Sequence, residues 1–373
     1  MKFICLQDNL KKGLALVSHI NNKNINLPIL NNILFKANDG GVELISTNLE
    51  IGITHQLRGK VEEIGEFTVD AKIISDYANL LPEEKVELKE VDSEISLKCG
   101  NYKTKIKGES SKEFPLIPVI DRGNFCEFNI FDFKKALSSV AFAVANNDNR
   151  LELSGVSFIF SDNILTLAAT DSYRLAERKI VIKGGNINNS QLIVPSRTIQ
   201  EVLRIISNFS ADAQTIESDI VKIYVSDNQI LFSLDSVEII SRLISGQYPD
   251  YRQIIPDKYK TEVVLRRQDL IRAIKASSIF SKTGIYDISL VLKKSLVNVY
   301  SSSGQSGESS IDLSAEVNGD DNDITINYRY LLDGLNIIES ELVNLRVINN
   351  NTPCALSSPE DENYLYIVMP IRN

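Results

Sequence analysis

The stretch LSGVSFIFSDNILTLAATDSYRL, residues 153–175, predicts a β-hairpin near the middle of the chain. Apolar residues alternate with small or polar ones over residues 156–160, and they return over residues 164–169. Polar residues 161–163 are expected to form the turn. The alternation breaks at residues 170–175, TDSYRL, where an aromatic, a cation and an aliphatic residue follow one another. This ending is not part of an ordinary hairpin pattern.

The hairpin belongs to a unit that recurs along the chain. A shift of 123 residues maps a predicted helix near the N-terminus onto a central one, and the same shift maps Leu30 onto Leu153 and Thr47 onto Thr170. A fainter third copy follows at a shift of 132 residues, which maps Val156 onto Ile288. One offset that holds across a helix and a hairpin is hard to obtain by chance, so we infer an internal repeat.

Each copy is predicted to run strand, helix and three strands, and then to run the same order again. The first copy opens with a strand at residues 2–6, a helix that Asp8 is expected to cap, and a hairpin over residues 32–47. The strand-to-helix junction that opens each second half is expected at residues 69–74, 194–199 and 326–331. The sequence therefore predicts an α+β protein of three similar domains.

Proline-rich segments predict the domain boundaries. Residues 114–118 and 248–256 are expected to be stiff connectors, because proline removes a ladder donor and restricts the backbone. The expected domains cover residues 1–119, 120–248 and 249–373. A length of 373 residues and a hydrophobic content of 43% agree with two or three full cores.

Charge and cysteine content limit the class of protein. The formal net charge of −9 argues against a generally basic nucleic-acid binder, but it leaves open a protein with its cations on one side. No apolar run approaches the roughly 20 residues that span a bilayer, and no signal peptide is recognisable at the start. The four cysteines form no CxxC pair, so we expect no disulfide framework, no zinc site and a reduced, cytoplasmic setting.

The predicted helices carry recurring cations on the side away from their apolar stripe. One interpretation is that every amphipathic helix has a solvated face on which lysine is common. The repeat favours a second interpretation, in which equivalent positions form one basic surface that holds a polyanion through its phosphates. The cations concerned are Lys11, Lys12, Lys72, Lys134, Lys135, Arg197, Arg204, Arg272, Lys275 and Arg329.

No catalytic, cofactor or metal site is predicted. The sequence has no phosphate-binding loop, nucleophile elbow, zinc-protease motif or dinucleotide fingerprint. His19 and His55 have no nucleophile or ligand motif beside them, so structural roles are expected for both. Two alternatives stay open: an enzyme of repeated build whose site forms between domains, and a protein-only scaffold, which would not need basic helices.

The whole chain resembles one family, the beta sliding clamp of bacterial DNA polymerase III. The resemblance rests on motifs that are weak alone but occur in order: MKF at the start, LPIL at 27–30, TD at 170–171 with RL at 174–175, VP at 194–195, YPDYR at 248–252 and VMPIR at 368–372. It implies a non-enzymatic processivity subunit without cofactors. Two crescent-shaped subunits of three domains would pair head to tail into a ring, with helices inside and sheets outside, that encircles duplex DNA without sequence preference.

The resemblance also implies a cleft between the second and third domains. Partners, which include the polymerase III catalytic subunit, the clamp loader, other polymerases and repair proteins, would insert a short peptide with a glutamine and bulky apolar residues. Carried over by position, the cleft is lined by Leu153, Thr170, Ser172, Tyr173, Arg174, Leu175, Pro249, Gln253, Ile254, Ile367, Met369, Pro370, Ile371 and Arg372. Taken alone, Leu153, Leu175 and Ile254 are equally compatible with a purely core role.

Further residues follow from the same resemblance. Loops that would touch DNA contain Lys23, Asn24, Asn147 and Arg150, and the ring interface would join Ile279 and Phe280 of one subunit to the edge strand around Thr104 and Ile106 of its neighbour. The sequence departs from the family pattern at Tyr173, where many relatives have histidine, at Gln253, where a basic residue is common, at Asn373 in place of a terminal leucine, and at Thr104 in place of a larger apolar residue. These departures bear on peptide preference and interface strength.

Overall fold

The computed structural model describes residues 1–20, 26–146, 150–211, 219–304 and 306–372. Four residues singled out above, Lys23, Asn24, Asn147 and Asn373, lie outside the described residues. The chain divides into two compact units. The first comprises residues 1–131, 183–187 and 200–243, and the second comprises residues 132–182, 188–199 and 244–373.

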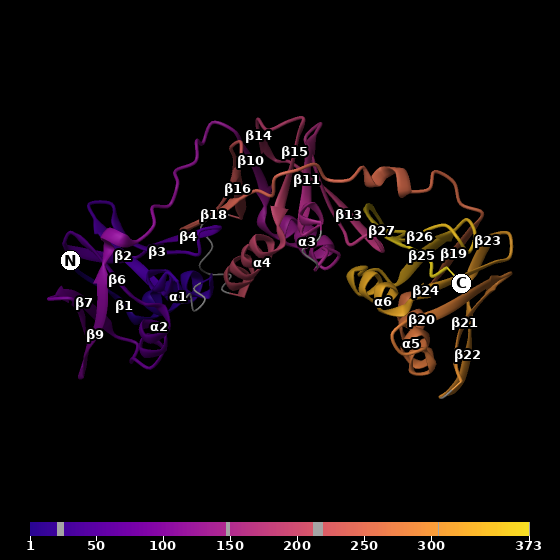
Figure 1. Ribbon diagram of the computed structural model, residues 1–373, viewed down its shortest axis with the longest axis horizontal. Coiled ribbons are helices and arrows are strands. Elements are labelled where there is room, and N and C mark those ends of the chain that lie inside the picture. Colours follow the sequence, from indigo (N-terminus) through magenta and orange to yellow (C-terminus); the bar gives the residue numbers. More distant parts are fainter. Residues whose placement is uncertain (21–25, 147–149, 212–218, 305, 373) are drawn as a thin grey trace. The chain divides into compact units, whose positions relative to one another are not determined.

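Among its described residues, the first copy of the repeat contains nine strands and two α-helices. Figure 1 shows it in indigo to purple at the N-terminal end of the colour scale. Its first half comprises β1 (Lys2–Leu6), α1 (Gln7–Val17), β2 (Asn32–Asn38), β3 (Gly41–Thr47), β4 (Ile51–Leu57) and β5 (Gly59–Glu63). Its second half comprises β6 (Gly65–Asp70), α2 (Ala71–Asn79), β7 (Lys85–Val91), β8 (Glu94–Cys99) and β9 (Tyr102–Ser110).

The second and third copies repeat this order. The second comprises β10 (Phe125–Asn129), α3 (Ile130–Ala141), β11 (Gly155–Ser161), β12 (Ile164–Thr170), β13 (Arg174–Val181), β14 (Gly184–Gly185), β15 (Ser190–Pro195), α4 (Ser196–Ala211), β16 (Ile220–Val225), β17 (Gln229–Leu234) and β18 (Val237–Arg242). The third comprises β19 (Thr261–Arg266), α5 (Arg267–Ser277), β20 (Asp287–Lys293), β21 (Leu296–Ser303), β22 (Gly307–Ser314), β23 (Glu316–Gly319), β24 (Asn322–Asn327), α6 (Tyr328–Ile337), β25 (Leu342–Val347), β26 (Cys354–Ser358) and β27 (Asp361–Val368).

The prediction of three α+β repeats is confirmed, with one addition. Each copy has a fourth short strand in its first half, β5, β14 or β23, which the alternation pattern did not reveal. Each of these pairs with the opening strand of its own copy, β1, β10 or β19. They are short or strongly exposed, so they carry little apolar periodicity to detect.

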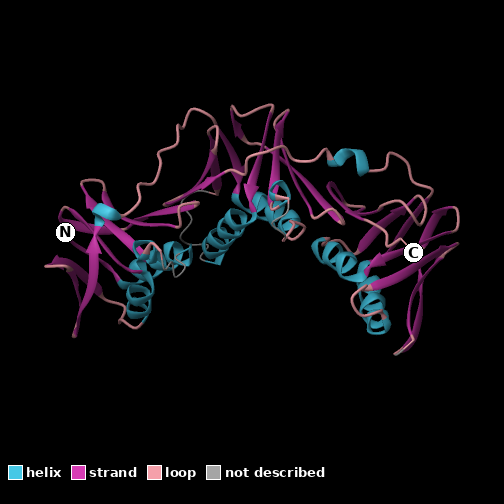
Figure 2. Ribbon diagram, in the orientation of Figure 1, coloured by secondary structure: helices cyan, strands magenta, loops and turns pink. Residues whose placement is uncertain are grey.

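Every copy builds the same two half-sheets. The first half-sheets have the strand orders β4-β3-β2-β6, β13-β12-β11-β15 and β22-β21-β20-β24. The second have the orders β9-β8-β7-β1-β5, β18-β17-β16-β10-β14 and β27-β26-β25-β19-β23. The helices lie on one side of the strands within each unit, and α1 packs beside α2 as α5 packs beside α6 (Figure 2).

Backbone pairing continues from one copy to the next. In the first unit β4 pairs antiparallel with β18, with Ile53 opposite Ile239. In the second unit β13 pairs antiparallel with β27, with Leu175 opposite Ile367. These two joins produce sheets of 14 and 9 strands among the described residues, and in both the fourth strand of one copy meets the last strand of the next copy.

The apolar stripe of α1 is buried as predicted, but the N-cap of this helix is not the predicted residue. Leu10 and Leu14 are buried, whereas Leu6, not Asp8, occupies the N-cap position and makes no side-chain cap. The expectation for Asp8 is wrong, because the helix begins two residues earlier than a cap at Asp8 would require and places Asp8 in its first turn. There the carboxylate is 3.0 Å from the ammonium of Lys12, four residues on.

The four cysteines are buried and unpaired with one another. Burial raises the pKa of Cys5 and of Cys354 to about 12, so both thiols stay protonated at neutral pH. Within the described ranges no helix has the length and apolar character to cross a membrane, and no group of three His, Cys, Asp or Glu side chains could hold a metal ion.

A close contact in α6 yields the first prediction. Gly334 lies against the ring of the fully buried Tyr366, where an added Cβ would overlap the ring carbons, and Tyr366 also donates its hydroxyl to the carbonyl of Tyr330 at 2.9 Å. Replacing Gly334 by Ala should therefore lower the free energy of unfolding by about 1–3 kcal/mol, although alanine favours helices. Denaturant unfolding measures this. Asn336→Ala on the exposed side of the same helix is the control, and equal stability of the two variants would contradict the packing.

Candidate functional site

The unusual ending of the central hairpin is a turn that also exists in the first copy. Thr170 Oγ1 donates to the carbonyl of Arg174 at 2.6 Å and accepts from the N–H of Ser172 at 3.1 Å. Thr47, 123 residues earlier, makes the same two bonds at 3.0 and 3.1 Å. Ser172 and its counterpart Leu49 have φ angles of 78° and 75°. The backbone of the turn therefore belongs to the repeat, and only its side chains are specific to the second copy.

Arg174 replaces a core residue, because its counterpart Ile51 is buried. The guanidinium uses all three of its nitrogen atoms: Nε donates to Asp171 at 3.0 Å, Nη2 to the carbonyl of Phe142 at 2.8 Å, and Nη1 to Asp333 at 2.5 Å. Asp333 belongs to α6, so Arg174 ties the turn to that helix. Charge-assisted bonds of this kind are strong when largely buried. Three of its five N–H donors are therefore engaged within the chain, and Arg174 also lines one of the hollows described below, so its role in binding a peptide stays a prediction.

Tyr173 lies at the surface beside this network. Its side chain is 63% exposed, and its ring stacks on that of Tyr330 with centroids 6.4 Å apart and an interplanar angle of 19°. Arg174 lies over the other ring, with its central carbon 4.7 Å from the Tyr330 centroid. The carbonyl of Tyr173 accepts from the N–H of Met369 at 2.8 Å, which brings the C-terminal segment against the turn.

Two neighbouring hollows flank this contact in the second unit. The smaller has a volume of about 220 Å³ and is lined by Arg150, Leu153, Thr170, Ser172, Arg174, Pro249, Asp250, Tyr251, Ile254, Ile367 and Met369. The larger has a volume of about 580 Å³ and is lined by Ser172, Tyr173, Gln253, Ile254, Ile255, Pro256, Ile348, Asn351, Thr352, Pro353, Met369, Pro370 and Arg372. Ser172, Ile254 and Met369 line both, so they separate two parts of one groove, which we call the partner cleft.

The structure brings together most residues that were expected in the cleft. Leu175 and Ile371 are the exceptions, since neither lines a hollow. Leu175 is fully buried in the sheet, as the core interpretation had it, and Ile371 donates its N–H to the carbonyl of Thr325 at 2.8 Å. Leu153 is also buried but contributes to the wall of the smaller hollow.

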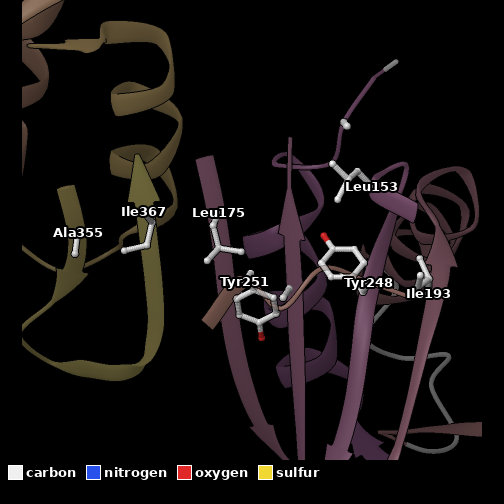
Figure 3. Close-up of a cluster of buried hydrophobic side chains, with 9 residues drawn as sticks. Leu153, Leu175, Ile193, Tyr248, Tyr251, Ala355 and Ile367 are labelled. Carbon is white, nitrogen blue, oxygen red and sulfur yellow. The ribbon is translucent and has the colours of Figure 1, made fainter. Parts of the chain in front are cut away.

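A buried apolar cluster supports the floor of the cleft (Figure 3). Tyr248 and Tyr251 lie along the sheet between Leu175 and Ile193, and they come from the proline-rich connector. The Tyr248 hydroxyl accepts from the N–H of Thr170 at 3.0 Å, so the connector is bonded directly to the turn. The connector is therefore an integral part of the wall.

Tyr251 is held by a buried hydrogen bond. Its hydroxyl donates to Glu177 Oε2 at 2.7 Å, and both side chains are buried. Burial, together with the negative charge of Glu177, raises the pKa of Tyr251, so the phenol keeps the proton that it donates. Loss of the Tyr251 hydroxyl would leave Glu177 Oε2 without its buried donor, although Lys179 lies 3.7 Å from the other carboxylate oxygen. Such a loss costs more than the bond contributes, so the bond holds the connector in place.

Sequence reasoning missed several lining residues. Tyr251 lies within the YPDYR motif and could have been included, because an aromatic residue between prolines in a connector often packs on its neighbours. Ile348 and Pro353 belong to the loop between β25 and β26, and nothing in the repeat or the motifs marks them. Their position depends on how that loop folds against the C-terminal segment.

The expected basic residues are mostly exposed on their helices. Several make surface ion pairs, including Lys12 with Asp8, Lys72 with Asp76, Lys135 with Glu339 and Arg272 with Asp269. Such pairs contribute little to stability, so these cations remain able to exchange partners. Lys11, Arg197 and Lys275 are exposed, Lys134 is half-buried, and Arg329 lies 3.6 Å from the ring centroid of Tyr286.

Two cations have other surroundings than expected. Arg204 on α4 donates to the carbonyls of Ala15 and Leu16, at 3.0 and 2.6 Å, and pairs with Glu201 at 2.9 Å. Arg204 thus satisfies carbonyls in the last turn of α1, and its expected contact with DNA stays a prediction. Arg150 lines the smaller hollow and donates to Ser172 Oγ at 3.3 Å, so it belongs to the partner cleft.

The residues expected at the ring interface differ in exposure. Ile279 is 71% exposed at the end of α5, and Phe280 next to it lies against Gly307 at the start of β22. Thr104 is half-buried on β9, whereas the Ile106 side chain is buried in its own copy. The Ile106 side chain is therefore not available to a neighbour, and only its backbone lies at the strand edge.

Comparison with known proteins accounts for nearly the whole chain. Residues 1–118, 128–250 and 252–372 match the N-terminal, central and C-terminal domains of the DNA polymerase III beta subunit. The beta sliding clamp of Synechocystis sp. is 26% identical, with 100% of this chain and 99% of that protein covered. The beta sliding clamp of Staphylococcus epidermidis is 27% identical, with 93% of this chain and 92% of that protein covered.

Solved structures agree with these matches. The DNA polymerase III beta subunit of Thermotoga maritima has a TM-score of 0.91 and 25% identity, and covers 100% of this chain and 99% of its own. A sliding clamp of Pseudomonas aeruginosa bound to griselimycin has a TM-score of 0.93 and 25% identity over 100% of both chains. Three matched domains in the right order and three copies of one fold show that this chain belongs to the DNA polymerase III beta subunit family, the beta sliding clamps.

Proposed function

We propose that this chain is the processivity clamp of a replicative DNA polymerase, and that it works in the cytoplasm as a closed ring around duplex DNA. The family is non-catalytic, so the protein contributes topology and tethering to DNA synthesis. Its three clamp domains are proposed to cover residues 1–119, 120–248 and 249–373, and the three matched ranges support these boundaries. The observation that carries the proposal is the pairing of strands between successive copies.

Among the described residues, the edges equivalent to those that join successive copies have no strand partner in the first and third copies. β4 pairs with β18 and β13 pairs with β27, so the equivalent third-copy strand is β22 and the equivalent first-copy strand is β9. Among the described residues, β22 pairs only with β21, and residues 102–107 of β9 pair only with β8. Open edges of this kind readily accept another strand. A second copy offering β9 to β22 would repeat the internal join and give head-to-tail closure.

Charge favours this head-to-tail orientation. β9 exposes Lys103, Lys105 and Lys107, whereas β22 exposes Glu308 and Asp312. Opposite charges on facing strands stabilise the pairing, and like charges oppose the head-to-head alternative. The exposed Ile279 beside β22 adds apolar area to the same contact.

Reversal of these charges should open the ring. Replacing Lys103, Lys105 and Lys107 by Glu should convert a dimer into a monomer at micromolar concentration, because both facing strands then become acidic. Sedimentation measures the mass. Adding Glu308→Lys and Asp312→Lys to the same chain should restore the dimer, while Lys258→Glu serves as the matched control. A wild-type monomer, or a dimer insensitive to the reversals, would count against this interface.

The exposed cations of the helices are proposed to face the duplex. Those retained from the sequence analysis are Lys11, Lys12, Lys72, Lys134, Lys135, Arg197, Arg272, Lys275 and Arg329, with Lys23, Asn24 and Asn147 in segments outside the described residues. Their contacts with phosphates would be sequence-independent and screened by salt. Weak contacts suit a ring that holds DNA by topology and must slide. A protein-only scaffold would gain nothing from such a surface.

Retention on DNA should depend on topology. With a clamp loader, the protein should stay on circular duplex DNA through gel filtration at raised salt and should leave when the DNA is cut once, because sliding off a free end needs no contact to break. The charge-reversed monomer should not be retained on either form. Stable retention on linear DNA with free ends would contradict topological holding.

The partner cleft is proposed to take a short peptide from the polymerase, the clamp loader and repair proteins. Its walls combine Ile254, Met369 and Pro370 with the exposed Tyr173, which suits bulky apolar side chains. Arg372 is an exposed cation of the larger hollow, as Arg150 is of the smaller, and is suited to a peptide carboxylate or carbonyl. Arg174 is partly engaged within the chain. Gln253 donates to Asp250 Oδ2 at 3.0 Å and adds no charge to this wall.

Met369 should be a central contributor because it lines both parts of the cleft. Replacing Met369 by Ala should weaken binding of a glutamine-containing apolar peptide by about tenfold or more, as expected for a buried anchor of an interface. Fluorescence anisotropy measures the affinity. The control is Leu116→Ala, which removes apolar area at a 96% exposed site in the other proline-rich connector, residues 114–118. Unchanged affinity with an intact dimer would move the peptide site elsewhere.

A further inference from the structure

A separate hollow lies in the first unit and is not part of the partner cleft. Its volume is about 380 Å³, and α1, the end of β4, the C-terminal part of α4 and the turn between β17 and β18 surround it. Figure 1 shows α1 and β4 in indigo at the N-terminal end of the colour scale. The volume is within the range of pockets that bind small ligands.

Its floor is largely apolar. Ala15 and Leu16 of α1 form one part and the His55 ring forms another, with 9% of His55 exposed. Burial lowers the pKa of His55 to about 4, so the ring is neutral at pH 7 and behaves as an aromatic surface. Gly13 leaves room for this ring, since a Cβ there would lie 2.8 Å from His55 Cδ2.

Its rim is polar and carries both cations and amides. Lys11 and Arg58 contribute positive charge, and Lys12 is balanced by Asp8 at 3.0 Å. Asp235 is the other acidic residue of the lining. Four carboxamides complete the rim: Asn9, Gln56, Asn79 and Asn208.

These features together match one class of ligand. Cationic side chains bind phosphate, carboxamides offer paired donors and acceptors to the edge of a heterocycle, and aromatic or apolar surfaces stack against its face. Phosphate alone would make no use of the apolar floor, and a purely apolar ligand would make no use of the charged and amide-bearing rim. We propose that this hollow binds a nucleotide, with its base on the floor of Leu16 and His55 and its phosphate on Lys11 and Arg58.

The nucleotide has two possible sources with the same chemistry: a free mononucleotide, and the terminal nucleotide of a nucleic-acid strand. The inference does not rest on ring closure or on the partner cleft, because every residue that lines the hollow belongs to the first unit. The clamp function and the nucleotide site can therefore fail separately.

Calorimetric titration of the full chain with dAMP, deoxyadenosine and inorganic phosphate tests the proposal. We expect dAMP to bind at least about tenfold more tightly than deoxyadenosine or phosphate, because base and phosphate contacts act together. Equal affinity for phosphate and dAMP would overturn the proposal, since the floor would then be unused. An absence of saturable binding by all three would overturn it as well.

Two variants locate the site. Ala15→Trp fills the hollow from the exposed side of α1 without a change of charge, and Arg58→Gln removes a cation from the rim. Each should weaken dAMP binding by about tenfold or more. Lys98→Gln, an equal charge change at an exposed site outside the hollow, should leave it unchanged. Thermal unfolding checks that each variant is folded, and unaltered dAMP affinity in both folded variants would overturn the assignment.

A competition experiment distinguishes a free mononucleotide from the terminal nucleotide of a nucleic-acid strand. A 5′-phosphorylated single-stranded oligonucleotide should displace dAMP if strand ends are bound, and a circular single strand, which has no end, should not. Displacement by the linear strand alone supports a terminal nucleotide, and displacement by neither supports a free one. Displacement by both strands would overturn the proposal in favour of general strand binding. The Ala15→Trp variant should have the same dimer mass and the same retention on circular DNA as the unmodified protein. This result would separate the nucleotide site from the clamp function.

Discussion

The structure depends on backbone pairing between the last strand of one copy and the fourth strand of the copy before it. An unpaired sheet edge presents N–H and C=O groups that need partners, and β4–β18 and β13–β27 satisfy them within the chain. Among the described residues, the same constraint leaves β22 and residues 102–107 of β9 with one strand partner each, which is the basis of the proposed pairing with a second copy. In that proposal the lysines of β9 would face the acidic residues of β22.

The partner cleft lies where the second of these joins occurs. Leu175 and Ile367 face each other in the ladder, and the turn before β13 carries Tyr173 and Arg174 on a backbone that the first copy also has. In the first copy the position of Arg174 is taken by the buried Ile51. A change of side chains on a repeated frame was therefore enough to create a groove, while the connector with Tyr248 and Tyr251 supplied its opposite wall.

Charge is separated within an acidic protein. The net charge is −9, yet the helices expose a series of lysines and arginines. Most of their ion pairs are at the surface and weak, which keeps the cations available to a polyanion. Arg204 departs from this pattern, because its guanidinium donates to the carbonyls of Ala15 and Leu16 in the last turn of α1. The neutral His55 shows the converse, since burial has removed the charge that its side chain could carry.

The sequence by itself determined the three copies, the order of strands and helices and most of the cleft residues. Apolar periodicity and turn residues act over a few positions, so they can be read locally, and the repeat and the family resemblance extended them to the whole chain. Only the tertiary structure decided that Leu6 occupies the N-cap position of α1, that Leu175 is core, that Arg150 faces the cleft and that Ile348 lines it. It also decided which strands join successive copies. These outcomes depend on partners far apart in the chain, and a local pattern carries no information about which distant group will approach.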